Sequence, residues 1–293
     1  METYLRNKLQ VEIANALKQC IKGLTNPDEP AYIAALVMNL PSQLEAIFNH
    51  TFPTLNFKVG GCFLHQKPIA EFCEKKSLGY KKDPEIGDLL IVYKKIHGAE
   101  VVYNALLLQA KKLNGNTDSI YHHRIGYNDM HQLFLYTHWP KFIYRKANNL
   151  NGRKRNVIPK TITAGAQYLL IDKNAVCTPF WCAMPNDILV ASKCLASQLV
   201  DFIEFQTGRT FVKSAPKDSW SQMIWDLLKI SFQSVFNKPK YGYVKASRAS
   251  DGISDFLDLP QKLTLSDNDD NNDVGIPILC IQSKEKEDND ELK

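Results

Sequence analysis

The sequence has no run of about 18 consecutive apolar residues, the length that a membrane-spanning helix requires. Its first 20 residues, "METYLRNKLQVEIANALKQC", mix charged and apolar side chains and lack the uninterrupted apolar core of a secretory signal. Both absences predict a cytoplasmic protein. The chain has 293 residues, 44% of them hydrophobic and 23% charged, which is typical of a globular protein that buries a sizeable core.

The sequence also lacks the cysteine pairs that mark a disulfide framework or a zinc site. Its seven cysteines are scattered, mostly among apolar neighbours, and the closest pair, Cys177 and Cys182, has no second pair to match it. The four histidines between residues 122 and 138 do not have the tight spacing of zinc ligands either. We therefore expect reduced cysteines and no structural zinc.

Charge is distributed unevenly along the chain. Residues 266–293 hold nine acidic and three basic side chains, net −6, which leaves 22 acidic and 33 basic side chains, net +11, in residues 1–265. A basic body attracts polyanions such as nucleic acid, although charge alone gives only nonspecific binding. Five candidates for phosphate contacts gather in the expected loop "RKANNLNGRKR": Arg145, Lys146, Arg153, Lys154 and Arg155. An ordinary solvated loop is the alternative.

The periodicity of apolar residues predicts an α/β fold. Four-residue steps predict a helix over 3–23, and prolines mark the starts of two more, near residues 27–30 and at Pro41. Strands are expected at 55–66, 87–96, 100–113, 141–145, 166–172 and 276–282, and further helices at 127–139, 192–205 and 219–236. This order predicts one α/β domain over residues 1–265, with a mixed central sheet flanked by helices. The acidic segment 266–293 follows, with one strand.

Two of these strands, 87–96 and 100–113, are separated only by "HGA" and predict an antiparallel hairpin. Asp88 stands at the start of the first strand. Gln109 and Lys111 lie near the end of the second, on one face because their spacing is two. Asp88 and Gln109 supply oxygen ligands of the kind that Mg²⁺ accepts, and Lys111 is placed to orient a water and favour its ionised form. A polar strand end that merely emerges into solvent is the alternative.

This constellation resembles the PD-(D/E)xK nuclease superfamily, in the Gln-x-Lys variant of Mrr-like restriction endonucleases. "GDLLIV" supplies Asp88, and "LLLQAKK" supplies Gln109 and Lys111. The resemblance covers roughly residues 40–145 and implies a restriction-endonuclease-like core. It also implies a third catalytic and metal-binding carboxylate on the helix before the hairpin, for which Glu45 in "SQLEAIF" is the candidate.

The function implied by this resemblance is hydrolysis of phosphodiester bonds with Mg²⁺ or Mn²⁺ held by Asp88, Gln109 and Glu45. Because the Gln-x-Lys relatives are restriction enzymes, DNA is expected as substrate rather than RNA. Bacterial defence against foreign DNA, together with a protein partner, is the expected context. The alternative is a catalytically silent member of the fold that binds nucleic acid or serves in assembly.

Two more polar side chains are candidates for the surroundings of this site. His65 in "FLHQKP" lies on the strand expected beside the hairpin, and Gln132 shares one face of the helix 127–139 with Tyr136. The alternative for His65 is a packed or surface histidine. The alternative for Gln132 is an ordinary amphipathic helix.

Overall fold

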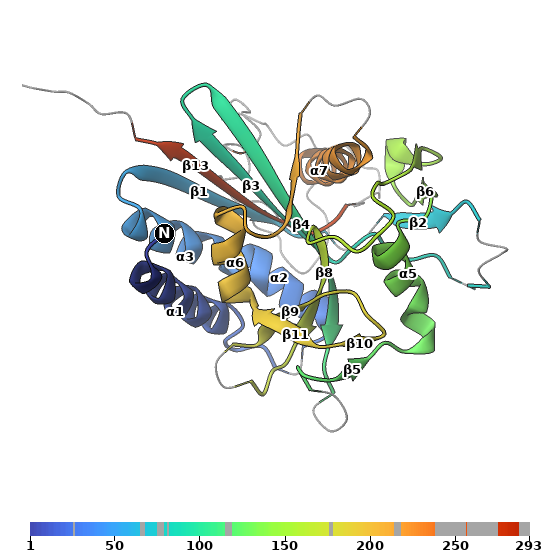
Figure 1. Cartoon of the computed structure of the whole chain (residues 1–293), viewed down its shortest axis with the longest axis horizontal. Helices are drawn as coiled ribbons and strands as arrows, with labels where there is room; N and C mark the ends of the chain where they lie inside the picture. The colour runs from blue at the N-terminus through green and yellow to red at the C-terminus, as the bar shows by residue number, and fades with distance from the viewer. Residues whose placement is uncertain are drawn as a thin grey trace, which may run out of the picture.

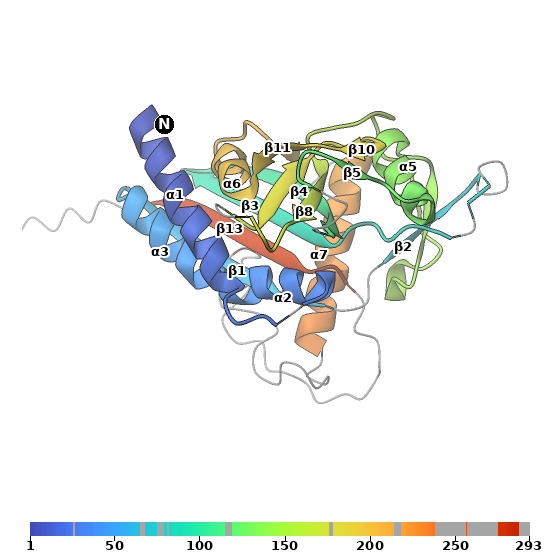
Figure 2. The ribbon, with the colours of Figure 1, turned by 90° about the horizontal axis from the view of Figure 1, so that it is seen from below.

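A central sheet of eight strands, with helices on both of its faces, organises the chain in the computed structural model (Figure 1, Figure 2). The structure describes residues 1–25, 27–64, 68–74, 79–80, 82–114, 119–175, 178–213, 218–237, 256 and 275–286. The predicted class, α/β with a mixed central sheet flanked by helices, is confirmed.

Four helices cover one face of the sheet: α1 (Thr3–Cys20), α2 (Glu29–Asn39), α3 (Pro41–Thr51) and α6 (Leu195–Ile203). α2 begins where Asp28 accepts a hydrogen bond from the backbone N–H of Ala31 at 3.0 Å. α3 begins at Pro41, because the first turn of a helix needs no N–H donor. The three predicted N-terminal helices are thus confirmed. No single helix in the described ranges is long and apolar enough to cross a membrane, and α2 and α3 pass that test only as a pair bent by 46°.

The strands of the sheet lie in the order β1, β13, β3, β4, β8, β9, β11, and β12 pairs with the first part of β4. Their bounds are Leu55–Cys62 (β1), Ile278–Glu285 (β13), Leu89–His97 (β3), Glu100–Lys112 (β4), Ala166–Ile171 (β8), Phe180–Ala183 (β9), Ala191–Cys194 (β11) and Arg209–Phe211 (β12). β13 runs parallel to β3, and β8 runs parallel to β4. β3 and β4 form the predicted antiparallel hairpin, with Leu89 opposite Leu108.

β13 comes last among the strands in the chain, yet it lies inside the sheet, between β1 and β3. The strand predicted within 266–293 is therefore confirmed. The boundary at residue 265 is corrected, because β13 is an inner strand of the same sheet as the preceding residues. Leu279 and Ile281 face one core, and Ile278 and Cys280 face the other. Burial on both faces explains why this strand is a continuous apolar run.

The second face of the sheet is covered by α5 (Met130–His138) and α7 (Ser219–Asn237), and the short 3₁₀ helix η1 (Tyr127–Asp129) leads into α5. Two small sheets lie outside the central one: β2 (Ile69–Phe72), β6 (Phe142–Arg145) and β7 (Lys154–Arg155) form the first, and β5 (His123–Arg124) pairs with β10 (Ile188–Leu189) in the second.

The segment 145–155 is not the loop that its composition predicted. It contains the end of β6, the 3₁₀ helix η2 (Asn148–Leu150) and β7. Leu150 is buried within it, and Tyr144 directly before it is fully buried. These two apolar anchors hold the segment against the body of the protein, whereas its many Asn, Lys and Arg residues suggested only solvation.

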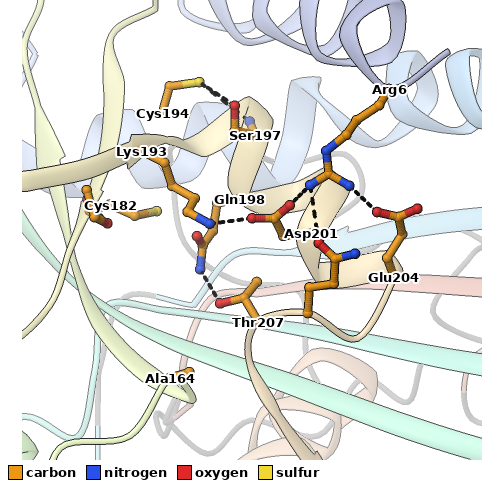
Figure 3. A network of polar contacts seen from close by, with 12 residues as sticks. Arg6, Ala164, Cys182, Lys193, Cys194, Ser197, Gln198, Asp201, Glu204 and Thr207 are labelled. Atoms are coloured by element: carbon orange, nitrogen blue, oxygen red, sulfur yellow. Dashed lines mark hydrogen bonds and ion pairs between the residues drawn. The ribbon is translucent and has the colours of Figure 1, made fainter. Parts of the chain in front are cut away.

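A network of charges joins α1 to α6 (Figure 3). Arg6 on α1 forms ion pairs with Asp201 and with Glu204 at the end of α6, and Lys193 on β11 also pairs with Asp201. The N-terminal ammonium lies 3.1 Å from a Glu204 oxygen. Because each of these carboxylates faces opposite charges, the network ties the first helix of the chain to the far end of the sheet.

Candidate active site

Asp88 and Gln109 are in direct contact at one end of the hairpin. Asp88 immediately precedes β3, and its backbone N–H donates to the Leu108 carbonyl at 2.8 Å, which places its side chain opposite that of Gln109. The Asp88 Oδ2 atom accepts hydrogen bonds from the Gln109 amide nitrogen and, at 2.7 Å, from the Ala110 N–H. Both side chains are almost completely buried. The hairpin therefore brings together the first two residues of the sequence motif.

Lys111 lies on the same face of β4 as Gln109, but its ammonium is held by another acid. The Nζ atom donates to Asp129 Oδ2 at 2.8 Å, and the exposed fractions of the two side chains are 11% and 40%. Asp129 is the last residue of η1 and lies 18 positions further along the chain. The ion pair fixes the direction of the Lys111 ammonium, and Lys111 itself lies two residues beyond Gln109 on the same face of β4.

Glu45 does not join this group, contrary to the sequence prediction. Its Oε2 atom accepts the Val59 N–H of β1 at 2.8 Å, and its Oε1 atom lies 3.5 Å from the Lys58 ammonium. β1 is separated from β3 by β13, so Glu45 sits on a different part of the sheet from Asp88. The reason is the inserted last strand, which moves β1 and the helix packed on it away from the hairpin.

The carboxylate that a helix does bring to Asp88 is Glu29, in the first turn of α2. Glu29, Glu85 and Asp88 line one pocket of about 220 Å³. The Glu29 Oε1 atom accepts the Lys112 N–H of β4 at 2.6 Å, which anchors α2 to the end of the hairpin. In the sequence, "PDEP" is a signal for a helix start, and this signal already accounts for Glu29. Its position in the pocket beside Asp88 therefore could not be predicted from the sequence.

Tyr168 is the other member of the site that the sequence did not reveal. It lies on β8 directly beside Gln109 of β4 and is fully buried. Burial raises the pKa of its hydroxyl, and the nearby carboxylates of Asp129 and Asp88 raise that pKa further. The hydroxyl is thus neutral. Its signal was weak, because a tyrosine in "AQYLLI" is also an ordinary strand residue.

Two buried polar atoms of this group lack a hydrogen-bond partner within the described part of the chain: Gln109 Oε1 and the Tyr168 hydroxyl oxygen. Tyr136 of α5, which packs beside Tyr168, instead donates to the Ile86 carbonyl at 2.9 Å. Leaving a buried polar group unpaired costs about 1–3 kcal/mol. The two unpaired atoms therefore favour a ligand or water on the face of the sheet where the side chains of Gln109 and Tyr168 lie.

The other predicted neighbours have mixed outcomes. Gln132 lies on α5, and its side-chain oxygen is buried with no partner among the residues that the structure describes. Its neighbour His131 is buried near the Lys111–Asp129 pair; burial lowers the pKa of His131, Asp129 opposes that shift, and Lys111 adds to it. His131 is therefore neutral at pH 7. His65 lies outside the described residues.

The five basic residues between 145 and 155 are mostly engaged with acids. Arg153 and Arg155 pair with Asp226 of α7, at 3.6 and 2.6 Å, and Arg145 pairs with Glu71. Arg155 is largely buried by this contact, whereas Arg145 and Arg153 stay about half exposed. Phosphate binding by this segment stays a prediction. Lys146 and Lys154 remain exposed.

The donor set at Asp88 is compatible with a hard divalent cation. It offers a carboxylate and an unpartnered amide oxygen, the ligand types that Mg²⁺ and Mn²⁺ accept. Because the Gln109 nitrogen faces Asp88, the amide has to rotate to present its oxygen there. Within the described ranges, no group of three or more His, Cys, Asp or Glu side chains could hold a metal ion. Water and substrate phosphate would therefore complete the shell, as is common for Mg²⁺.

Comparisons with known proteins add no relative. No protein-family model, no curated protein sequence and no solved structure matches the chain.

Proposed function

We propose that this chain is a metal-dependent nuclease that hydrolyses phosphodiester bonds, with DNA as substrate, and that it acts in the bacterial cytoplasm in defence against foreign DNA. The observation that carries the proposal is the contact between Asp88 and Gln109, in which a buried amide oxygen has no partner among the described residues. The spacing of this pair and of Lys111 is that of the PD-(D/E)xK resemblance. The finer fold assignment, a restriction-endonuclease-like core, belongs to the same proposal.

Each residue of the site has a role in this reaction. Asp88 and Gln109 hold the cation through their side-chain oxygens, and Glu29 adds negative charge in the adjoining pocket. The bound cation would stabilise the charge that builds on the phosphorane. Lys111 orients the attacking water and favours its ionised form, because its ammonium lowers the energy of a nearby anion. The Lys111–Asp129 pair positions that ammonium before substrate binds.

A second function is favoured by the same ion pair. Lys111 is nearly buried and already neutralised by Asp129, so its charge is partly withdrawn from any phosphate. A silent member of the fold, in which the hairpin end serves only structure, would have this contact. Such a protein would bind nucleic acid or assemble with a partner without cleaving.

Incubation with linear, circular and single-stranded DNA and RNA, in Mg²⁺, Mn²⁺ or EDTA, separates the two functions. A nuclease cleaves at least one substrate with the metal ions and none in EDTA. Lys111→Ala should lower the cleavage rate at least 100-fold while the thermal midpoint changes by no more than a few degrees. Lys95→Ala, on the distal part of β3, serves as the matched lysine control and should cleave as the parent does. Binding without cleavage under every condition would favour the silent module.

A further inference from the structure

The segment 119–129 exposes two aromatic rings and two basic or titratable side chains beside the candidate active site. Tyr121 and Tyr127 have exposed fractions of 71% and 83%, and His122 and Arg124 are exposed between them. We call these four residues the Tyr–Arg rim. Single exposed apolar residues are common, but two exposed tyrosines only six positions apart, with exposed basic groups between them in the chain, make this segment a candidate binding surface.

The backbone of the rim is held in place, so that the rings are presented by a fixed support. Ser119 and His122 exchange two backbone hydrogen bonds of 3.1 Å, and β5 pairs with β10. Ile125 donates its N–H to the Asp187 carbonyl at 2.9 Å, and η1 follows. Ordering the support beforehand lowers the entropic cost of binding.

The rim leads directly to Lys111. Tyr127 is the first residue of η1, and Asp129, the last residue of this short helix, holds the Lys111 ammonium at 2.8 Å. A chain that lies along β5 toward η1 therefore arrives at the end of the hairpin where Asp88 and Gln109 meet. Tyr121 and Tyr127 are at most about 20 Å apart along an extended backbone, which a few nucleotides span.

The chemistry of the rim selects a polyanion with exposed planar rings. Residues 119–128 contain Arg124 and two histidines and no Asp or Glu. Two carboxylates lie close by: Asp129, which is neutralised by Lys111, and the exposed Asp187, whose neighbour Ile188 is opposite Arg124 in the β5–β10 pair. Tyrosine faces stack on unpaired bases, at about 1–3 kcal/mol per base, whereas the bases of a duplex already stack on one another. Arginine adds phosphate contacts.

We propose that the Tyr–Arg rim binds single-stranded nucleic acid and guides it to the Asp88 site. This inference rests on the proposed function and narrows its substrate to single strands or unpaired ends. The bases stack on Tyr121 and Tyr127, and Arg124 contacts the phosphates between them.

Fluorescence anisotropy with the full chain tests the rim independently of cleavage. The probes are a fluorescein-labelled 20-nucleotide oligo(dT) and a 20-base-pair duplex, both in EDTA. The double variant Tyr121→Ala/Tyr127→Ala should bind oligo(dT) at least tenfold more weakly, and the duplex less than twofold more weakly. The Phe double variant should bind oligo(dT) within about twofold of the parent, because it keeps the rings. Arg124→Gln should flatten the slope of log affinity against log salt by about 0.7.

Tyr4 provides a matched control, since it is 79% exposed on α1. Tyr4→Ala should bind both probes as the parent does. Unchanged oligo(dT) binding by the Ala double variant would overturn the proposal that the rim binds single strands. An equal loss of affinity for both probes would also overturn it, because it would indicate a general basic surface. An equal loss in the Ala and Phe variants also overturns it. If the parent binds oligo(dT) through the rim but cleaves nothing in Mg²⁺ or Mn²⁺, the proposed binding role of the rim is supported and the nuclease proposal is wrong.

Discussion

Two of the polar clusters in the described residues differ in whether opposite charges face their buried oxygens. In the α1–α6 network, Asp201 faces both Arg6 and Lys193, and Glu204 faces Arg6 and the N-terminal ammonium. At the hairpin end, Gln109 Oε1 has no partner within the described residues. A network whose charges are all opposed needs nothing further. A buried group with an unpaired atom is poised for something that brings its own polar atoms.

Substitutions of Gln109 should have the largest effect on cleavage, and they test directly whether its unpaired oxygen binds a cation. Gln109→Leu removes the amide oxygen and should lower cleavage at least 100-fold, because a cation ligand is lost. Gln109→Glu keeps an oxygen and adds negative charge beside Asp88, so cleavage should persist and require less Mg²⁺. Cleavage rates measured across a Mg²⁺ titration check both. Equal and full activity of the two variants would show that Gln109 is only a polar strand end.

Arg6→Ala should have the opposite effects: it should lower the stability of the fold and leave the cleavage rate unchanged. Removing this guanidinium leaves Asp201 and Glu204 less compensated at the α1–α6 contact, and we expect a loss of about 2–3 kcal/mol in the free energy of unfolding. Urea denaturation measures this loss, and the cleavage rate of the folded variant should match the parent. If cleavage falls in proportion while stability is unchanged, the network belongs to the active site.

Tyr168→Phe tests the second unpaired atom. The variant keeps the packing of the ring but deletes a buried hydroxyl that has no partner among the described residues, so stability should stay the same or rise by up to about 1 kcal/mol. Cleavage should fall roughly tenfold if the hydroxyl serves the reaction. A drop in thermal midpoint would assign the hydroxyl to the fold instead.

The smallest effect on nucleic-acid binding is expected from two exposed lysines, Lys146 directly after β6 and Lys154 in β7. Replacing Lys146 and Lys154 by Gln should weaken duplex binding slightly and flatten the slope of log affinity against log salt by at most about two units. Arg153→Gln and Arg155→Gln should instead lower stability, because these arginines pair with Asp226. Binding isotherms at several salt concentrations separate the two groups. An unchanged slope in the lysine variant removes this segment from the binding surface.

The features that were predictable from sequence are those that neighbouring residues determine. The helix starts at Asp28 and Pro41 and the hairpin around "HGA" depend on local propensity and period, and the structure has all of them. The contact of Asp88 with Gln109 followed from hairpin register. Each of these signals lies within about 25 residues.

The remainder depends on contacts between distant segments. The partners of Arg155 and Glu45 are set by α7 and by the placement of β1, and no local pattern encodes either one. Glu29 was missed because its helix-start signal already accounted for it. Tyr168 was missed because its neighbour Gln109 lies on a strand 59 positions earlier, and only the parallel pairing of β4 with β8 joins them.

The position of β13 has a consequence for the order of assembly. β3 cannot bond with its parallel neighbour until residues 278–285 arrive, and these begin 190 positions after Asp88. Such long-range parallel pairing is slow to form, and an open strand edge is prone to aggregation meanwhile. The residue that precedes this strand, Pro277, lines the Asp88 pocket, and its carbonyl accepts the Leu90 N–H at 2.9 Å. The pocket therefore gains its last wall only when the final strand docks, so nascent chains still lacking that strand present an incomplete site.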